Sequence, residues 1–173
     1  MGYKGYYYKG DEYMVKKIEL TQGEFAIVDN EIFDELNNYK WHYACGYARR
    51  NKRLENGKRK IVNMHREMMN TPDGFETDHI NGDRLDNRRS NLRIVTKHEN
   101  QRNAKARKGK SRFKGVSFYK TKRHKTGYWI ARIQVNGTAK RLGYFKNEKE
   151  AAVAYDQAAK KYYGEYARTN EVG

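Results

Sequence analysis

Short stretches of aromatic and branched residues, separated by polar turns, make up the first third of the chain. Such stretches predict β-strands, and they cover residues 6–8, 14–20, 25–28 and 41–49. Turns are indicated between them and after them at Gly10, Gln22-Gly23 and Asn56-Gly57. We therefore expect residues 1–60 to form a β-rich region.

One helix interrupts these strands, and one hairpin follows it. Residues 31–37 place Ile32, Phe33 and Leu36 on one side of a short helix. Residues 58–62 are expected to pair with residues 43–50, which leaves the basic loop 49–53 projecting outward.

The middle of the chain reads as a helix, then strand, loop, strand and helix. Residues 64–70 predict a short helix that ends before Pro72. The pattern from 75 to about 103 then follows, and Thr96 with Glu99 forms a capping box that places a helix start there. Asn100 falls one turn into this helix.

From residue 111 the pattern changes to a three-stranded sheet followed by one helix. Strands are expected at 113–119, 128–135 and 138–145, the last two joined by the hairpin signal Asn136-Gly137. The helix begins after Asn147 and ends at Gly164. Alternation places Trp129, Ala131 and Ile133 on one face of the sheet, and Ile130, Arg132 and Gln134 on the other. Alanines on the helix allow close packing on the sheet, with Tyr155 and Tyr162 expected in the core.

These patterns predict an α+β protein built from small modules. They are a β-rich N-terminal region, a ββα finger, and a three-stranded antiparallel sheet packed on one helix. The expected boundaries are residues 1–60, 61–103, a basic linker at 104–110, and 111–173.

The charge of the chain indicates what kind of partner it binds. The 173 residues carry a net charge of +16, and residues 97–125 hold twelve Lys or Arg against one acid, Glu99. Such density is typical of a polyanion binder, although a solvated basic surface or a disordered tail would look similar. Nucleic acid is the partner we expect, and loop 49–53 is either a further contact with it or an ordinary solvated turn.

Cysteine content and hydropathy restrict the kinds of metal site and the cellular compartments that we expect. The single cysteine, Cys45, excludes a disulfide within the chain and a cysteine-based zinc site, and we expect it to be a buried small hydrophobe. No apolar run approaches the roughly 20 residues of a membrane span, and no signal peptide is evident. We expect a soluble protein of a reducing compartment, the host cell cytoplasm.

The chemistry gathers in two segments, 77–83 and 91–100. The first places Asp78 beside His79, and the second contributes Asn91 and Asn100. This set can bind one hard divalent cation and leave a histidine to act as a base. Asp83, Asp86 and Asn87 are interpreted as loop formers rather than ligands, because Asp and Asn bond their own backbone in turns.

These residues resemble the HNH endonuclease motif, a ββα-metal finger, in the Asp-His, Asn, Asn form of phage and intron homing nucleases. The resemblance implies that His79 is the general base and that Asp78 and Asn100 bind one Mg²⁺ or Mn²⁺. It implies that Asn91 completes the catalytic motif by bonding across the loop and holding the strands in register. His98 is an alternative ligand to Asn100, and His65 either approaches the site or packs in the core.

Residues 111–171 resemble the plant ethylene-response-factor (AP-two) type of DNA-binding domain. The matching segments are 113–116, 129–131, 142–145, 150–152, 154–156 and Asn170. The resemblance implies a sheet in the major groove of double-stranded DNA, with the helix behind it. Arginine suits guanine and glutamine suits adenine, while some of the cations would meet only phosphate or water. The candidate DNA contacts are Arg112, Lys114, Arg123, Trp129, Arg132, Gln134, Lys140 and Arg141.

Together these features predict a homing-type, site-directed DNA endonuclease. One site per chain predicts that a monomer nicks one strand, whereas a dimer would cut both. The alternative from another class is a non-catalytic DNA-binding transcription regulator. An RNA-binding protein has less support, because the sheet lacks the aromatic pair of an RNA-recognition motif.

Overall fold

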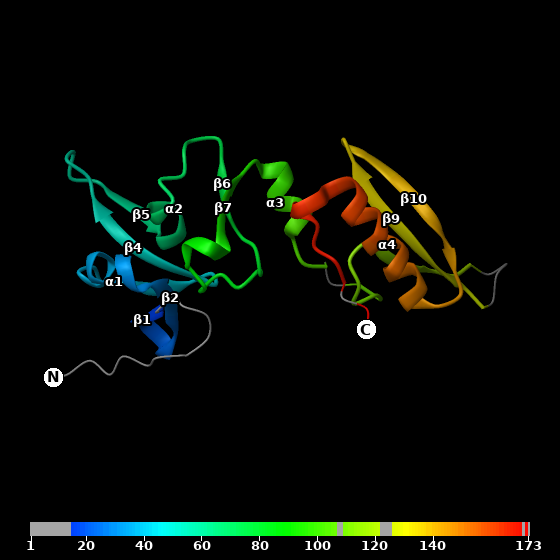
Figure 1. Cartoon of the computed structure of the whole chain (residues 1–173), viewed down its shortest axis with the longest axis horizontal. Coiled ribbons are helices and arrows are strands. Elements are labelled where there is room, and N and C mark those ends of the chain that lie inside the picture. The colour runs from blue at the N-terminus through cyan, green and yellow to red at the C-terminus, as the bar shows by residue number, and fades with distance from the viewer. Residues whose placement is uncertain (1–14, 107–108, 122–125, 171, 173) are drawn as a thin grey trace. The chain divides into compact units, whose positions relative to one another are not determined.

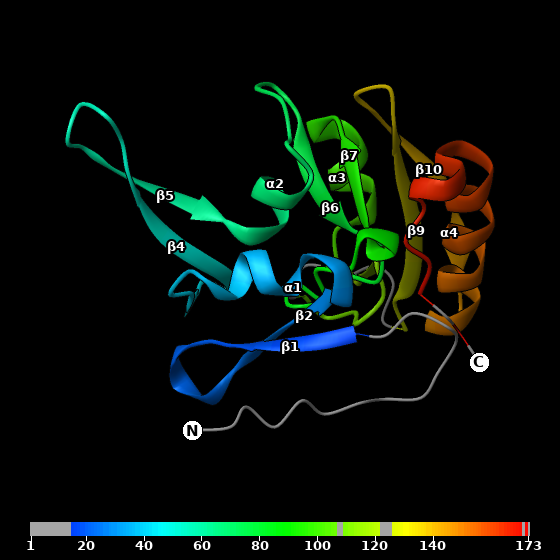
Figure 2. The same ribbon diagram turned by 60° about the vertical axis from the view of Figure 1, so that its left-hand side comes forward.

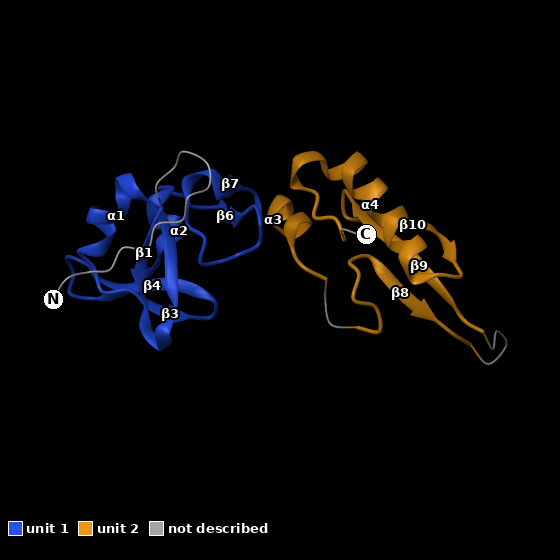
Figure 3. Ribbon diagram, turned by 60° about the horizontal axis from the view of Figure 1, so that its bottom comes forward, with its two compact units in different colours: residues 1–97 blue, residues 98–173 orange. Residues whose placement is uncertain are grey.

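The computed structural model describes residues 15–106, 109–121, 126–170 and 172 (Figure 1). The chain divides into two compact units, residues 1–97 and 98–173 (Figure 3). Several small antiparallel sheets and a few helices make up the described residues, which confirms the expected α+β class. Each unit is considered by itself.

Unit 1 begins with a hairpin and a helix that share one core. Strands β1 (Val15–Glu19) and β2 (Phe25–Asp29) pair around the short 3-10 turn η1 (Thr21–Gly23), and α1 (Asn30–Asn37) follows. The strand alternation buries Ile18, Ala26 and Val28, and α1 packs Leu36 against them. The expected helix at 31–37 is confirmed. Further members of this core are Leu20, Trp41, Ala48, Met64 and Met68.

A second sheet in unit 1 corrects three expectations. The stretch 41–49 is not one strand, because β3 (His42–Ala44) turns back into β4 (Tyr47–Arg53) at Cys45 and Gly46, whose φ angles are 54° and 83°. Cys45 is therefore exposed in a tight turn, not buried. The hairpin partner of β4 is β5 (Arg59–Asn63), so residues 49–53 are strand and the loop is 54–58.

The predicted finger follows the short helix α2 (Met64–Met68). It consists of β6 (Glu76–His79), the 3-10 turn η2 (Arg89–Asn91), β7 (Leu92–Val95) and α3 (Lys97–Asn103). Residues before and after position 60, expected in separate modules, bond to each other in unit 1. The Ile27 amide donates to the Leu85 carbonyl, and the Asn87 amide donates to the Ile27 carbonyl, both at 2.8 Å.

Unit 2 is built on the sheet order β10-β9-β8. Its elements are β8 (Val116–Tyr119), β9 (Tyr128–Val135), β10 (Thr138–Phe145), α4 (Glu148–Tyr163) and the 3-10 turn η3 (Gly164–Tyr166). The Asn147 side chain accepts from the Lys149 amide and Gly164 caps the far end, as expected. Ile133 packs against Tyr155 and Tyr163. Tyr163 thus takes the core place expected for Tyr162, which is 39% exposed.

Close packing of α4 explains the glycine at position 115. A Cβ there would lie 2.0 Å from a ring carbon of Tyr155 and 2.7 Å from the Arg132 carbonyl oxygen, and its φ is +74°. Only glycine fits both this space and this backbone conformation. Among the described residues, no helix is long and apolar enough to cross a membrane.

Candidate active site

The β6–β7 hairpin buries an aspartate beside a histidine. Asp78 is 6% exposed and His79 is 4% exposed. Asp78 stands directly opposite Arg93 in the strand register, and its Oδ2 accepts hydrogen bonds from Arg93 Nε at 3.0 Å and Nη2 at 2.8 Å. The arginine thereby balances the charge of a carboxylate that has little access to water.

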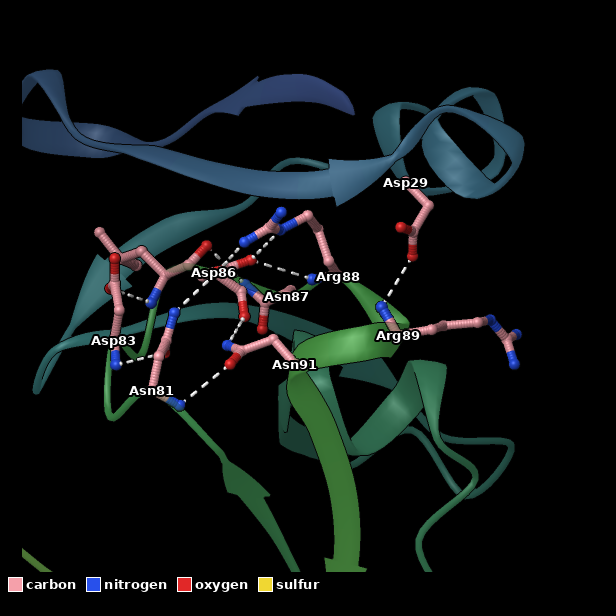
Figure 4. A network of polar contacts seen from close by, with 9 residues as sticks. Asp29, Asn81, Asp83, Asp86, Asn87, Arg88, Arg89 and Asn91 are labelled. Atoms are coloured by element: carbon pink, nitrogen blue, oxygen red, sulfur yellow. Dashed lines mark hydrogen bonds and ion pairs between the residues drawn. The ribbon is translucent and has the colours of Figure 1, made fainter. Parts of the chain in front are cut away.

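The loop between these strands is braced by asparagine and aspartate side chains (Figure 4). Asn91 Nδ2 donates to the Asp86 carbonyl at 2.8 Å, and its Oδ1 accepts from the Asn81 amide at 3.0 Å. Asp83 Oδ1 accepts from the Leu85 amide at 3.0 Å. Asn91 therefore ties both ends of the loop together.

Asp86 is held by an arginine two residues on. Its Oδ2 lies 2.7 Å from Arg88 Nη2, and it also accepts from Asn81 Nδ2 at 2.9 Å. Burial works to raise the pKa of Asp86, but the hydrogen bonds and charge of Arg88 outweigh burial and lower it. Asp86 is thus an ionised brace of the loop.

The N-terminal region holds this loop from outside. Besides the two backbone bonds from Ile27, the Asp29 side chain accepts from the Arg89 amide at 2.8 Å (Figure 4). Strand β2 therefore supports the part of the loop that carries Asn87.

Asn87 fixes the protonation pattern of His79. Asn87 is 1% exposed, and its Nδ2 donates to the Leu85 carbonyl at 3.1 Å. A carbonyl only accepts, so the amide oxygen of Asn87 must be the atom that lies 3.3 Å from His79 Nε2. Nε2 then carries the hydrogen, and Nδ1 is the basic nitrogen of the neutral ring. Burial lowers the pKa of His79 and outweighs the opposing effects of Asn87 and nearby carboxylates, so the ring is neutral near pH 7.

Two further rings surround His79. Its ring centroid lies 4.9 Å from that of His65 and 6.1 Å from that of Tyr47, and the Tyr47 and His65 centroids are 5.0 Å apart. His65 is 5% exposed, and its Nδ1 is the one buried side-chain polar atom among the described residues that has no hydrogen-bond partner. Burial, and then the neighbouring His79 and arginine charges, lower the pKa of His65 to about 3.

Sequence reasoning missed part of this cluster. Asn87 was interpreted as a loop former, His65 was left open, and Tyr47 was not considered. The Asp-Asn pair at 86–87 was a signal for a second role beyond the turn. No local signal marks Tyr47, because its contact with His79 comes from packing between β4 and β6.

The other predicted ligands lie on α3. His98 and Asn100 belong to unit 2, and their roles stay predictions.

Lys114, a predicted DNA contact, is bonded within unit 2. The Lys114 ammonium donates to the Arg102 carbonyl, and the Arg102 guanidinium lies 5.3 Å from the Tyr163 ring centroid. Burial lowers the pKa of Lys114 to about 8.

The predicted DNA contacts fall on different faces of unit 2. Arg132, Gln134 and Arg141 are exposed on the face away from α4. Lys140 pairs with Ile133, so it lies on the α4 face, with its ammonium 5.2 Å from the Tyr162 ring centroid. Trp129 also lies on that face, 4.9 Å from Phe118 between centroids. Arg112 is exposed, and Arg123 lies outside the described residues.

The face away from α4 also carries tyrosines that sequence reasoning did not consider. Tyr119 is 46% exposed and Tyr144 is 55% exposed. Both ring centroids lie close to that of Tyr128, at 5.3 Å and 5.1 Å respectively. Ile130, which is 3% exposed, stands directly opposite Tyr144 in the strand register, so this face carries apolar residues of its own beside Arg132.

The chain is similar to a protein family and to individual known proteins. A family model described as HNH endonuclease matches residues 67–102. The chain is 27% identical over 158 residues to uncharacterized HNH endonuclease L560 of Acanthamoeba polyphaga mimivirus, a match that covers 87% of this chain and 77% of that protein. It is 42% identical over 59 residues to putative dehydration-responsive element-binding protein 2H of Arabidopsis thaliana, covering 32% of this chain and 38% of that protein. No solved structure matches the chain.

The matched family residues include Asp78, His79, Asn87 and Asn91. His79 and its partner Asn87 therefore lie within the part of the chain that matches the family model, whereas Tyr47 and His65 lie before it. Residues 67–102 are thus similar to the HNH endonuclease family.

Proposed function

We propose that the protein is a homing-type, site-directed DNA endonuclease with His79 as its general base. One observation carries this proposal: the His79 imidazole is buried and its Nε2 lies 3.3 Å from the amide oxygen of Asn87, while burial lowers its pKa and so favours the neutral ring. A neutral ring with a defined tautomer is the form in which histidine removes a proton from water.

The donor set also fits a divalent cation. Among the described residues, no group of three or more His, Cys, Asp and Glu side chains could form a cage made of protein ligands alone. Mg²⁺ does not need such a cage, because it commonly takes one or two protein oxygens and completes its shell with water and substrate phosphate. Asp78 would hold the ion, and the second ligand implied by the resemblance, Asn100 or His98, stays a prediction.

In this scheme each residue has one task. His79 takes the proton of the water that attacks phosphorus, and Asn87 keeps its ring in the required orientation. Asn91 holds the loop, and Arg93 holds Asp78 in place. A divalent cation at Asp78 would supply positive charge for the oxygen that leaves.

Unit 2 would supply much of the sequence specificity for double-stranded DNA. The relative with 42% identity over 59 residues is described as an element-binding protein, which supports an AP-two type of domain here. Arg132, Gln134 and Arg141 are our candidates for base contacts, with Arg112, Lys140 and Arg123 at phosphates. One site per chain favours nicking by a monomer.

Removal of the metal should abolish cleavage. Supercoiled plasmid carrying a random target library is incubated with the protein and Mg²⁺ or Mn²⁺, with and without chelator. Relaxed circles are expected only with free metal, and linear product would show paired active sites. Tight binding of a selected sequence without cleavage by any metal would contradict the nuclease and leave a DNA-binding regulator.

Replacing Asn87 by alanine should slow nicking on the order of 100-fold, because the wrong histidine tautomer removes the base. Asn81→Ala is the matched control, since Asn81 braces the same loop but bonds Asp86 and Asp83 rather than His79. Nicking rates and the ¹⁵N shifts of the His79 ring are measured on both variants. Equal rates in the two variants would show that Asn87 acts only through the loop.

A further inference from the structure

The outer half of the β4–β5 hairpin carries two like-charge pairs. The strand register places Lys52 directly opposite Lys60, and Arg53 directly opposite Arg59. All four side chains are exposed. Figure 2 shows the hairpin reaching out beyond the helices and strands that form the rest of unit 1.

These cations work against the hairpin that carries them. Like charges directly opposite each other on neighbouring strands are destabilising. None of the four side chains has a hydrogen bond, ion pair or ring contact with another described residue. Closer to the core the same strand behaves differently, since Arg49 Nε donates to Asn63 Oδ1 and Arg50 Nε donates to Glu67 Oε2, both at 2.8 Å. Among the described residues, no contact therefore gives the outer cations a role in the fold.

We propose that the β4–β5 ribbon is a second DNA-binding arm, which lies in a groove of the duplex that the nuclease cuts. The choice of DNA rests on the proposed function. The major groove admits a two-stranded ribbon, and phosphates on both walls would neutralise cations on both faces. Arg53, Arg59 and Ile61 share one face, and Ile61 is 63% exposed, so an apolar contact can accompany the charges there.

The same strand links this arm to the active site. Tyr47, at the inner end of β4, contacts His79, and Lys52 and Arg53 follow five and six residues later. At about 3.3 Å per residue these cations lie roughly 17–20 Å along the strand from Tyr47, which corresponds to about five or six base pairs of B-DNA. The arm should protect phosphates at about that distance from the cut.

Charge reversal on β5 tests the arm without weakening the hairpin. In the double variant Arg59→Glu, Lys60→Glu each new carboxylate faces a cation, so the ribbon is stabilised while its positive charge is removed. The control, Lys40→Glu with Lys160→Glu, changes the net charge equally at exposed positions outside the hairpin. Both pairs are made in the full chain with His79→Ala, so that DNA stays intact.

Binding is measured with a random 30-base-pair duplex at several salt concentrations. We expect the hairpin variant to bind at least about tenfold more weakly than its parent, with the salt slope reduced by about two, while the control changes less than about threefold. Equal losses in both variants would overturn the arm, because net charge alone would explain them. Tighter binding of duplex RNA or anionic vesicles than of DNA, with the same sensitivity to the hairpin variant, would overturn DNA as its occupant.

Failure of the nuclease and failure of the arm give different results. If the parent with His79 never cuts DNA but the hairpin variant loses affinity selectively, the DNA-binding arm is supported and the nuclease is contradicted. If the parent cuts and the hairpin variant binds as tightly as the control, the nuclease is supported and the arm is contradicted. If both stand, the hairpin variant with His79 loses footprint protection about five or six base pairs from the nick.

Discussion

Replacing His79 by alanine is expected to slow strand cleavage by about 10²- to 10⁴-fold, the usual contribution of a general base, while DNA affinity stays within about twofold. The imidazole is 4% exposed and lies at the end of β6, so it adds little to the charge that attracts DNA. Single-turnover nicking with Mg²⁺ measures the rate, and gel shift measures the affinity.

His42→Ala is the control for this loss. His42 lies on β3 in the same unit and is partly exposed, and no described contact joins it to the site. If His79→Ala nicks as fast as His42→Ala, His79 is not the general base. Equal thermal unfolding of the two variants ensures that the comparison concerns chemistry.

Acid should destabilise unit 1 through His65. The pKa of His65 is about 3 in the folded chain, against an ordinary value of 6.5. Between these values only the unfolded chain takes up the proton, so stability falls as pH falls, by roughly 1.4 kcal/mol per pH unit for one group. Above pH 6.5 the effect is absent, and below about pH 3 it is complete. From pH 7 to pH 5 the free energy of unfolding should drop by about 2 kcal/mol.

Trp41 reports this unfolding. It is one of two tryptophans and is 5% exposed in the core of unit 1, so a Trp129→Phe background leaves a single probe there. Urea unfolding is followed by fluorescence at several pH values, with and without His65→Gln. The Gln variant should flatten the dependence, with the remaining slope due to His79, whose pKa is also lowered. An unchanged slope in the variant would show that His65 takes up its proton without unfolding.

Local signals predicted the elements of this chain better than its contacts. The alternating run at 128–135, the Asn136-Gly137 turn and the Asn147 cap each depend on neighbours in sequence, and each lies where expected. The turn at Cys45-Gly46 was missed because the strand propensity of its neighbours hid it. Tyr162 and Tyr163 differ by one helical position, which periodicity alone did not resolve.

The candidate site shows the same limit. The spacing of Asp78, His79 and Asn91 indicated a finger, because Asn91 directly precedes the strand that pairs with the strand of Asp78 and His79. The partners that set the chemistry of His79 come from β4, α2 and the loop, and their meeting depends on tertiary packing. Its place in a turn already explained the asparagine at position 87, so nothing in the sequence indicated that its side chain also bonds His79.

The cations of β5 have one more consequence, for the behaviour of the molecule in solution. Among the described strands β5 pairs with β4 alone, so within this part of the chain its other side is an open edge that carries the exposed Ile61. Open, apolar edges invite strand pairing between molecules, and charged side chains prevent it. Arg59 and Lys60 therefore also guard against aggregation. Neutral replacements would lose that protection, whereas glutamates would keep it.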